Sequence, residues 1–438
     1  MNDQISYLKE TLKFKRARLT LDTYSEDGNH HYYTADRVIE FFVKIHMDLI
    51  IVIDYRFIKD EDSFISYFQK QCRRFVNRFG NSIRNHTIFE IEYNTRYDHE
   101  KLKNYTSFYR KIKAILKECT LDSEIIGPGI LVNEDSENFR SFVKANPDMH
   151  MFTIICAPYA FYEKGNEIFI NRLTDAGYVL EQYQRAKRIL LEEGRETDSV
   201  LITSWKDRIN DVDVLNETPW MGARIIRNVL AGYGICSSLP LDIPLDLMFD
   251  EISFDKTFNL LPGVMTSTGI RKPSWHALKL LDQQDELLAA ISEDYLITKS
   301  KEPGFIQILV HNCKKPGYKY YAKDILNQID DYKPDLFEDD IPKSFEMRFE
   351  GLPVGDYILK TRTVNDENGC AFGHYLNMHY NDDSFIGSGE SEYLEAASVI
   401  PVTGEMIKVT KSGILDLKVT LKMNEFKHLH LIKIKDNF

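Results

Sequence analysis

The sequence lacks two features: an apolar run long enough to cross a membrane, and an excess of basic residues. Its 438 residues include 55 Lys and Arg against 67 Asp and Glu, a formal net charge of −12. A membrane-spanning helix needs about 20 mostly apolar residues, and nucleic-acid phosphates are bound by clustered positive charge. We therefore expect no membrane contact, and contact with DNA only through a domain outside these residues. A local basic patch remains compatible with this balance.

Cysteine is also scarce, and its spacing has no pattern. The six cysteines include no C-x-x-C pair, which argues against a zinc site or a disulfide framework. The first residues, Met1-Asn2-Asp3-Gln4, lack the basic and apolar regions of a signal peptide. We expect reduced thiols, no metal or cofactor, and a cytoplasmic location.

Strand and helix patterns alternate over the first two-thirds of the chain. Residues 49–53 are a continuous apolar run typical of a parallel strand that is buried on both faces. Strands are predicted at residues 14–21, 49–53, 87–92, 124–132, 151–157, 200–205 and 233–239. The alternation indicates a (β/α)8 barrel or a doubly wound sheet, and the count favours the barrel.

The count of predicted barrel strands is seven, one short of a full barrel. Either the strand patterns miss one strand, or the chain is a fragment of a longer protein. In the second case the fragment begins between the first barrel strand and the first helix. We expect the second, with the first strand missing at the N-terminus.

After residue 285 the apolar pattern changes to alternation, as in strands with one buried face. Residues 305–310, 345–349 and 415–421 are the clearest examples. We predict a barrel over residues 1–285 and an antiparallel β-sandwich over residues 286–438. Near the end, His428 and His430 share one side of a strand, but no third metal ligand is nearby, so we expect exposed edge residues.

Four segments carry a specific similarity. Residues 258–281 contain G-I-R-K-P at 269–273, and residues 202–205 read I-T-S-W; F-K-R-A-R at 14–18 and F-E-I at 89–91 begin two other strands. Together they resemble glycoside hydrolase family 39, at the segment after the last barrel strand and at strands seven, two and four. The resemblance extends over nearly the whole chain.

The resemblance implies a catalytic site that has lost its acids. A retaining glycosidase uses two carboxyl groups about 5 to 5.5 Å apart, one as nucleophile and one as acid/base. By position, Asn94 stands at the acid/base and Ser204 at the nucleophile. An amide cannot protonate a leaving oxygen, and a serine without an adjacent base is a poor nucleophile. We therefore expect a pseudoenzyme with no catalytic residues.

Arg18 and Trp205 are retained from the family's cleft, and two acids remain near it. Glu90 and Glu92 lie on the same strand face as Asn94, toward the barrel interior, where Arg18 is the expected partner. There are three alternatives for these acids. They form a structural ion pair with Arg18, Glu92 contacts a ligand, or the chain is an active but atypical retaining glycosidase (β-xylosidase-like) that uses Glu90 or Glu92.

The candidate ligand-binding residues of this vestigial cleft are spread over three predicted strand ends. Trp205 could stack on a sugar or pack at the barrel rim. The candidates are Arg18, Glu92, Asn94, Ser204 and Trp205.

Degenerate domains similar to this family also occur in bacterial AraC/XylS-type transcriptional regulators, including those of the Rsp and Rbf type. The resemblance implies a non-catalytic effector-sensing or dimerisation domain with a small-molecule or carbohydrate effector. It is compatible with a homodimer, and DNA would be bound by a separate helix-turn-helix domain. A purely structural module with a closed cleft is a further alternative.

Overall fold

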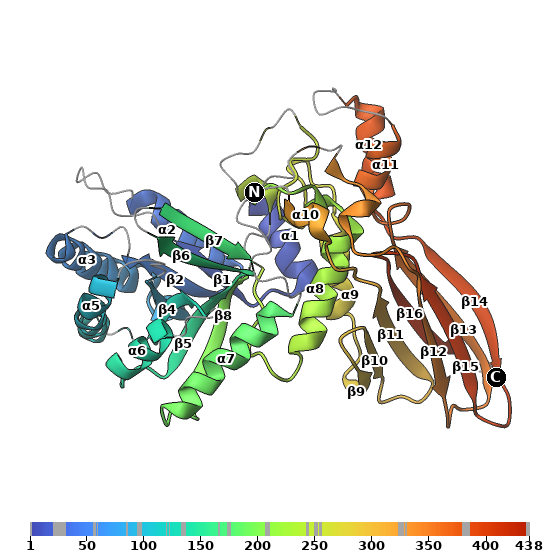
Figure 1. Cartoon of the computed structure of the whole chain (residues 1–438), viewed down its shortest axis with the longest axis horizontal. Coiled ribbons are helices and arrows are strands. Elements are labelled where there is room, and N and C mark those ends of the chain that lie inside the picture. The colour runs from blue at the N-terminus through green and yellow to red at the C-terminus, as the bar shows by residue number, and fades with distance from the viewer. Residues whose placement is uncertain are drawn as a thin grey trace.

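A computed structural model describes residues 2–20, 32–55, 58, 60–84, 86–93, 99–119, 121, 123–132, 137–164, 167–172, 177–205, 211–241, 245–248, 253, 256–322, 328, 331–378 and 386–434. A curled parallel sheet wrapped by helices is followed by antiparallel sheets (Figure 1). The predicted fold class, a barrel-type α/β domain and a C-terminal β-sandwich, is confirmed. In the described part of the chain, no helix combines the length and apolar character that a membrane span requires.

The first sheet contains six parallel strands in chain order. They are β1 (Arg16–Thr20), β2 (Asp48–Asp54), β3 (Thr87–Glu92), β4 (Ile125–Leu131), β5 (Met151–Cys156) and β8 (Ser199–Trp205). Strand β2 is buried along its centre because both faces are covered: Ile51 and Ile53 pack in the core under the helices, while Ile50 and Val52 line the barrel interior. The continuous apolar run at 49–53 is explained by this double burial.

Helices flank the sheet on its outer side. They are α1 (Asn2–Leu12), α2 (Tyr32–Lys44), α3 (Glu61–Phe79), α4 (Asn81–Arg84), α5 (His99–Glu118), α6 (Glu137–Ala145), α7 (Tyr178–Glu192), α8 (Pro219–Gly232) and α9 (Pro273–Asp282). Helix α3 begins where the carboxylate of Asp60 accepts hydrogen bonds from two backbone N–H groups, and it buries Phe64, Phe68 and Phe75 against the core. A hairpin of β6 (Tyr159–Lys164) and β7 (Glu167–Arg172), which the strand patterns did not predict, is inserted between β5 and α7.

The strand predicted at residues 233–239 is not formed. Helix α8 ends at Gly232, and turns and coil follow. The segment nevertheless runs beside β8, because the Ser237 and Ser238 hydroxyls donate to the carbonyls of Val200 and Ile202, at 2.7 and 3.2 Å. Side-chain hydrogen bonds replace a backbone ladder, so the described sheet has six strands and not seven, with β1 and β8 as its edges.

The C-terminal region forms two antiparallel sheets. One has the order β14 (Val402–Val409), β13 (Gly355–Val364), β16 (Phe426–Lys433), β11 (Phe305–His311), β10 (Tyr295–Lys299) and β9 (Leu287–Ile291); the other pairs β12 (Lys343–Phe349) with β15 (Leu415–Leu421). Tyr357, Leu421 and Leu431 pack between the two sheets. Short helices α10 (Tyr318–Ala322), α11 (Ala371–Asn377) and α12 (Ser388–Ala397) lie in the connections.

The outer face of the larger C-terminal sheet packs against α8 and α9, which lie between the two regions in Figure 1. The approach is close, since a Cβ atom on Gly222 of α8 would lie 2.6 Å from the ring of Phe426. Because α9 ends at Asp282 and β9 begins at Leu287, we propose to keep residue 285 as the domain boundary.

The expectation for His428 is wrong. It lies on β16 in the interior of the sheet, is 1% exposed, and its Nε2 is 2.8 Å from Oε1 of Gln307. Burial lowers the pKa of His428 to about 3, so the ring is neutral. Both faces of β16 are covered, which alternation alone did not indicate.

Candidate functional site

The centre of the candidate site is a cluster of Arg18, Glu90 and Glu92 on the inner face of the parallel sheet. Arg18 Nε donates to Glu90 Oε2 at 2.6 Å, and its Nη2 donates to Glu92 Oε2 at 2.5 Å. The register explains the contact, because Arg18 aligns with Ile50 and Ile50 aligns with Ile88, two residues before Glu90 on the same face. The predicted pairing of Arg18 with the two glutamates is confirmed.

Burial strengthens the electrostatic interactions between the three side chains of this cluster. Glu90 is 0% exposed, Glu92 is 7% exposed, and 26% of the Arg18 side chain is accessible. Burial alone would lower the pKa of Arg18, but the charges of Glu90 and Glu92 hold it above its ordinary value. One cation therefore serves two buried carboxylates, and the cluster is anionic when all three groups are ionised.

Strand β4 leaves room for the two glutamates. Gly129 has φ +66°, and a Cβ atom there would lie 2.9 Å from Glu92 Cγ and 3.6 Å from Glu90 Oε1. Its backbone N–H donates to the Thr153 hydroxyl at 2.8 Å. A left-handed backbone next to a carboxylate demands glycine, and the sequence G-P-G at 127–129 was the available signal for this close approach.

Tyr105 supports the cluster from α5. Its hydroxyl donates to the Ile91 carbonyl at 2.7 Å, in the peptide unit between the two glutamates. Burial, reinforced by the charge of Glu90, raises the pKa of Tyr105 well above its ordinary value. The phenol is therefore a fixed neutral donor that holds β3 in place. No sequence signal indicated this role, because Tyr105 is one apolar-face position of a helix.

Trp205 lies at the end of β8 and is held by the surrounding structure. Its indole N–H donates to the Pro240 carbonyl at 2.7 Å, and the Arg224 guanidinium lies 5.4 Å from its ring centroid. Arg224 contacts the rings of Tyr178 and Trp220 as well. These contacts match the rim-packing alternative, and they join β8 to α8.

Of the other two candidate residues, Ser204 and Asn94, the structure describes only Ser204. Ser204 precedes Trp205 on β8 and aligns with Ile155 of β5. Asn94 lies outside the described residues. The structure thus brings Arg18 together with Glu92 and places Ser204 beside Trp205, while the ligand-binding role of all five residues remains a prediction. Among the residues that the structure describes, no group of three or more His, Cys, Asp or Glu side chains could hold a metal ion.

The G-I-R-K-P motif has a structural explanation that its sequence did not reveal. Lys272 Nζ is buried and donates to Glu217 Oε1 at 2.8 Å, to Asp246 Oδ1 at 3.0 Å and to the Leu261 carbonyl at 2.7 Å. Pro273 is the first residue of α9. The motif therefore ties two short 3-10 helices, Val214–Glu217 and Asp246–Met248, and the loop at Leu261 to the start of α9.

Comparisons with known proteins place this geometry in a fold. No family model matches the chain, and no curated protein does. Among solved structures, a glycoside hydrolase family 39 enzyme from Xanthomonas axonopodis pv. citri aligns with a TM-score of 0.77 at 14% identity, over 99% of this chain and 90% of that one. A monomeric β-xylosidase from Caulobacter crescentus aligns at 0.78 and 15% identity, over 99% and 93%. A bacterial orthologue of human α-L-iduronidase aligns at 0.66 and 12%, over 100% and 79%. The chain therefore has the fold of family 39 glycoside hydrolases.

Proposed function

We propose that this chain is a non-catalytic, glycosidase-like domain that senses a small-molecule or carbohydrate effector for an AraC/XylS-type transcriptional regulator. The observation that carries the proposal is the sharing of one guanidinium by Glu90 and Glu92. Retaining hydrolysis needs two carboxyl groups about 5 to 5.5 Å apart on opposite sides of the scissile bond. Here both acids lie on one strand and point to the same cation.

The resemblance adds that Asn94 and Ser204 occupy the catalytic positions. Neither an amide nor an unassisted hydroxyl performs the chemistry of the missing acids. Arg18 is the most accessible member of the cluster, with 26% of its side chain exposed, while 9% of the Glu92 side chain is exposed and Glu90 is fully buried. In the proposed domain Arg18 and Glu92 contact hydroxyl groups of the effector at the barrel mouth, where sites form in this architecture.

The regulator context comes from the same resemblance. The proposed protein binds DNA through a helix-turn-helix domain outside these residues, acts in the cytoplasm, and pairs as a homodimer. Size-exclusion chromatography with light scattering tests the last point, and a mass equal to one chain at all concentrations would remove the homodimer from the proposal.

The central test combines an activity assay with a binding assay on the same preparation. We expect no release of 4-nitrophenol from aryl β-D-xylosides or α-L-arabinosides above the buffer rate. We expect at least one sugar in a panel of mono- and oligosaccharides to raise the melting temperature, because a ligand that binds only the folded state stabilises it.

Glu92→Gln separates the competing ideas, because it keeps the side-chain volume and removes the charge. We expect it to abolish the sugar-dependent shift, whereas Glu338→Gln, on an exposed segment, leaves the shift intact. Turnover by the unmodified chain that disappears in Glu92→Gln would establish the atypical glycosidase instead. A panel without any binder would favour the purely structural module.

A further inference from the structure

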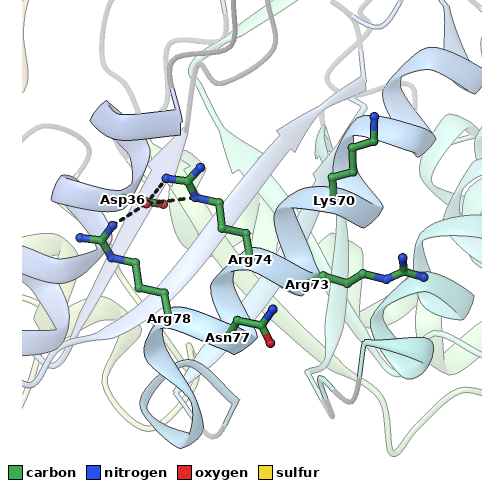
Figure 2. Close-up of a pocket in the computed structure, with 6 residues that line it drawn as sticks. All are labelled: Asp36, Lys70, Arg73, Arg74, Asn77 and Arg78. Carbon is green, nitrogen blue, oxygen red and sulfur yellow. Dashed lines mark hydrogen bonds and ion pairs between the residues drawn. The ribbon is translucent and has the colours of Figure 1, made fainter.

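One face of α3 carries a stripe of polar and basic side chains. Their spacing, i, i+3, i+4, i+7 and i+8, places them on a single helix face, opposite the buried phenylalanines. Together with Asp36 of α2 they line a shallow, open hollow of about 590 Å³ in the outer surface of the barrel (Figure 2). The stripe consists of Lys70, Arg73, Arg74, Asn77 and Arg78.

Two of these side chains are fixed by a buried carboxylate. Asp36 is 0% exposed, and its Oδ2 accepts hydrogen bonds from Arg74, through Nη2 and through Nε at 3.1 Å, and from Arg78 Nη1 at 2.8 Å. Figure 2 shows both guanidinium groups converging on this carboxylate. Asp36 thus holds two partly exposed guanidinium groups side by side before any ligand arrives, which reduces the entropy cost of binding.

The other ion pairs of the stripe are exposed to solvent. Arg73 Nη2 lies 2.6 Å from Glu118 Oε1, with more than half of each side chain exposed, and Arg78 Nη2 lies 2.9 Å from Glu40 Oε2. Lys70 is exposed at the rim. Because solvent-exposed ion pairs contribute little, an incoming anion can exchange with Glu118 and Glu40 at low cost.

We propose that this hollow, the α3 anion site, binds a compact ligand that bears phosphate groups. Arg73 can turn its paired N–H donors from the exposed Glu118 to phosphate oxygens, and Lys70 adds a second exposed cation. Arg74 and Arg78, which donate to Asp36, contribute positive charge beside them. The ligand is compact because Glu40 and Glu118 flank the stripe and would repel the broad polyanionic surface of a nucleic-acid duplex. With a net charge of −12, the rest of the chain supplies no general attraction for anions, so binding depends on these local contacts.

The test uses the full 438-residue chain and sodium pyrophosphate as the probe, in isothermal titration calorimetry at constant ionic strength. The informative variant is Lys70→Gln/Arg73→Gln, because neither residue contacts Asp36 and the fold is left intact. Each lost charge-assisted contact is expected to weaken binding roughly tenfold or more. The matched control, Lys408→Gln/Lys411→Gln, removes the same charge from an exposed position of β14 and from the exposed turn that follows it.

The proposal requires saturable binding of pyrophosphate that the α3 variant weakens and the control leaves unchanged, with equal melting temperatures for all three proteins. Equal weakening in both variants would show a general charge effect and overturn it. Absence of saturable binding would also overturn it, as would tighter binding of a short DNA duplex than of pyrophosphate at the same ionic strength. Because the α3 anion site lies outside the barrel mouth, none of these outcomes bears on the sugar-binding test above.

Discussion

The ammonium group of Lys272 lies 2.8 Å from Oε1 of Glu217, and both side chains are almost completely buried. Asp246 Oδ2 lies at the same distance from the ammonium. Burial alone would lower the pKa of Lys272, yet the two carboxylates raise it. One buried cation thus balances two buried acids between the barrel and the start of α9.

Lys272→Met should be one of the most destabilising single substitutions in the chain. It keeps the length of the side chain but leaves Glu217 and Asp246 as buried acids without a cation, which typically costs about 3–5 kcal/mol. Urea unfolding monitored by circular dichroism measures the loss. Lys299→Met, at an exposed position of β10, is the control and should cost less than about 0.5 kcal/mol. Similar values for both variants would mean that the triad contributes nothing specific.

The same triad predicts a pH dependence. Burial raises the pKa of Glu217 from 4.5 to about 7. Between these values the folded state holds a proton that the unfolded state has released, so the stabilising contribution is complete below pH 4.5 and is lost as the pH rises toward 7. We expect the unfolding free energy of the unmodified chain to fall by on the order of 2 kcal/mol between about pH 5 and pH 7.5 because of Glu217. Glu217→Gln should lack this decrease.

The comparison in that experiment is the unfolding free energy of the unmodified chain minus that of Glu217→Gln at each pH, because groups outside the Lys272 triad titrate equally in both proteins. A difference that stays constant across the range would show that Glu217 has an ordinary pKa. A stability of the unmodified chain relative to Glu217→Gln that falls toward acidic pH would show that its pKa is depressed.

Much of the architecture followed from local patterns. The run at 49–53 indicated a strand covered on both faces, and the alternation of Glu90 and Glu92 placed both acids on the inner face, where Arg18 meets them. These predictions succeeded because the periodicity of a strand fixes which face a side chain occupies.

The failures involve contacts between segments that are distant in the sequence. His428 seemed exposed because alternation assumes one solvent face, whereas α8 and α9 cover the outer face of that sheet. Residues 233–239 have the composition of a strand, but hydroxyl groups take the place of the ladder. The Lys272 triad joins residues 217, 246 and 272, and no local pattern links them.

Arg18→Met tests how much the cluster of Arg18, Glu90 and Glu92 contributes to the stability of the barrel. The substitution leaves Glu90 buried without its cation, and we expect a loss of about 3–5 kcal/mol in unfolding free energy. Adding Glu90→Gln and Glu92→Gln should recover part of this loss, because neutral amides tolerate burial better than unpaired carboxylates. A triple variant no more stable than Arg18→Met would argue that packing of the arginine stem, and not charge, stabilises the cluster.

Gly129→Ala tests the close approach between β4 and the glutamates. Two costs are expected: strain from a left-handed backbone, about 1–2 kcal/mol, and displacement of Glu92, whose Cγ would lie 2.9 Å from the new methyl group. Gly194→Ala is a matched control, since Gly194 has φ +70° but no atom within 4 Å of the position that a Cβ would occupy. The excess loss at residue 129 therefore reports the contacts of the new methyl group with the two glutamates, chiefly with Glu92, and thermal unfolding of the two variants measures it. Glu92→Ala removes the Cγ atom, so if Glu92→Ala/Gly129→Ala shows simple additivity, the methyl group and the Glu92 side chain do not compete for the same space.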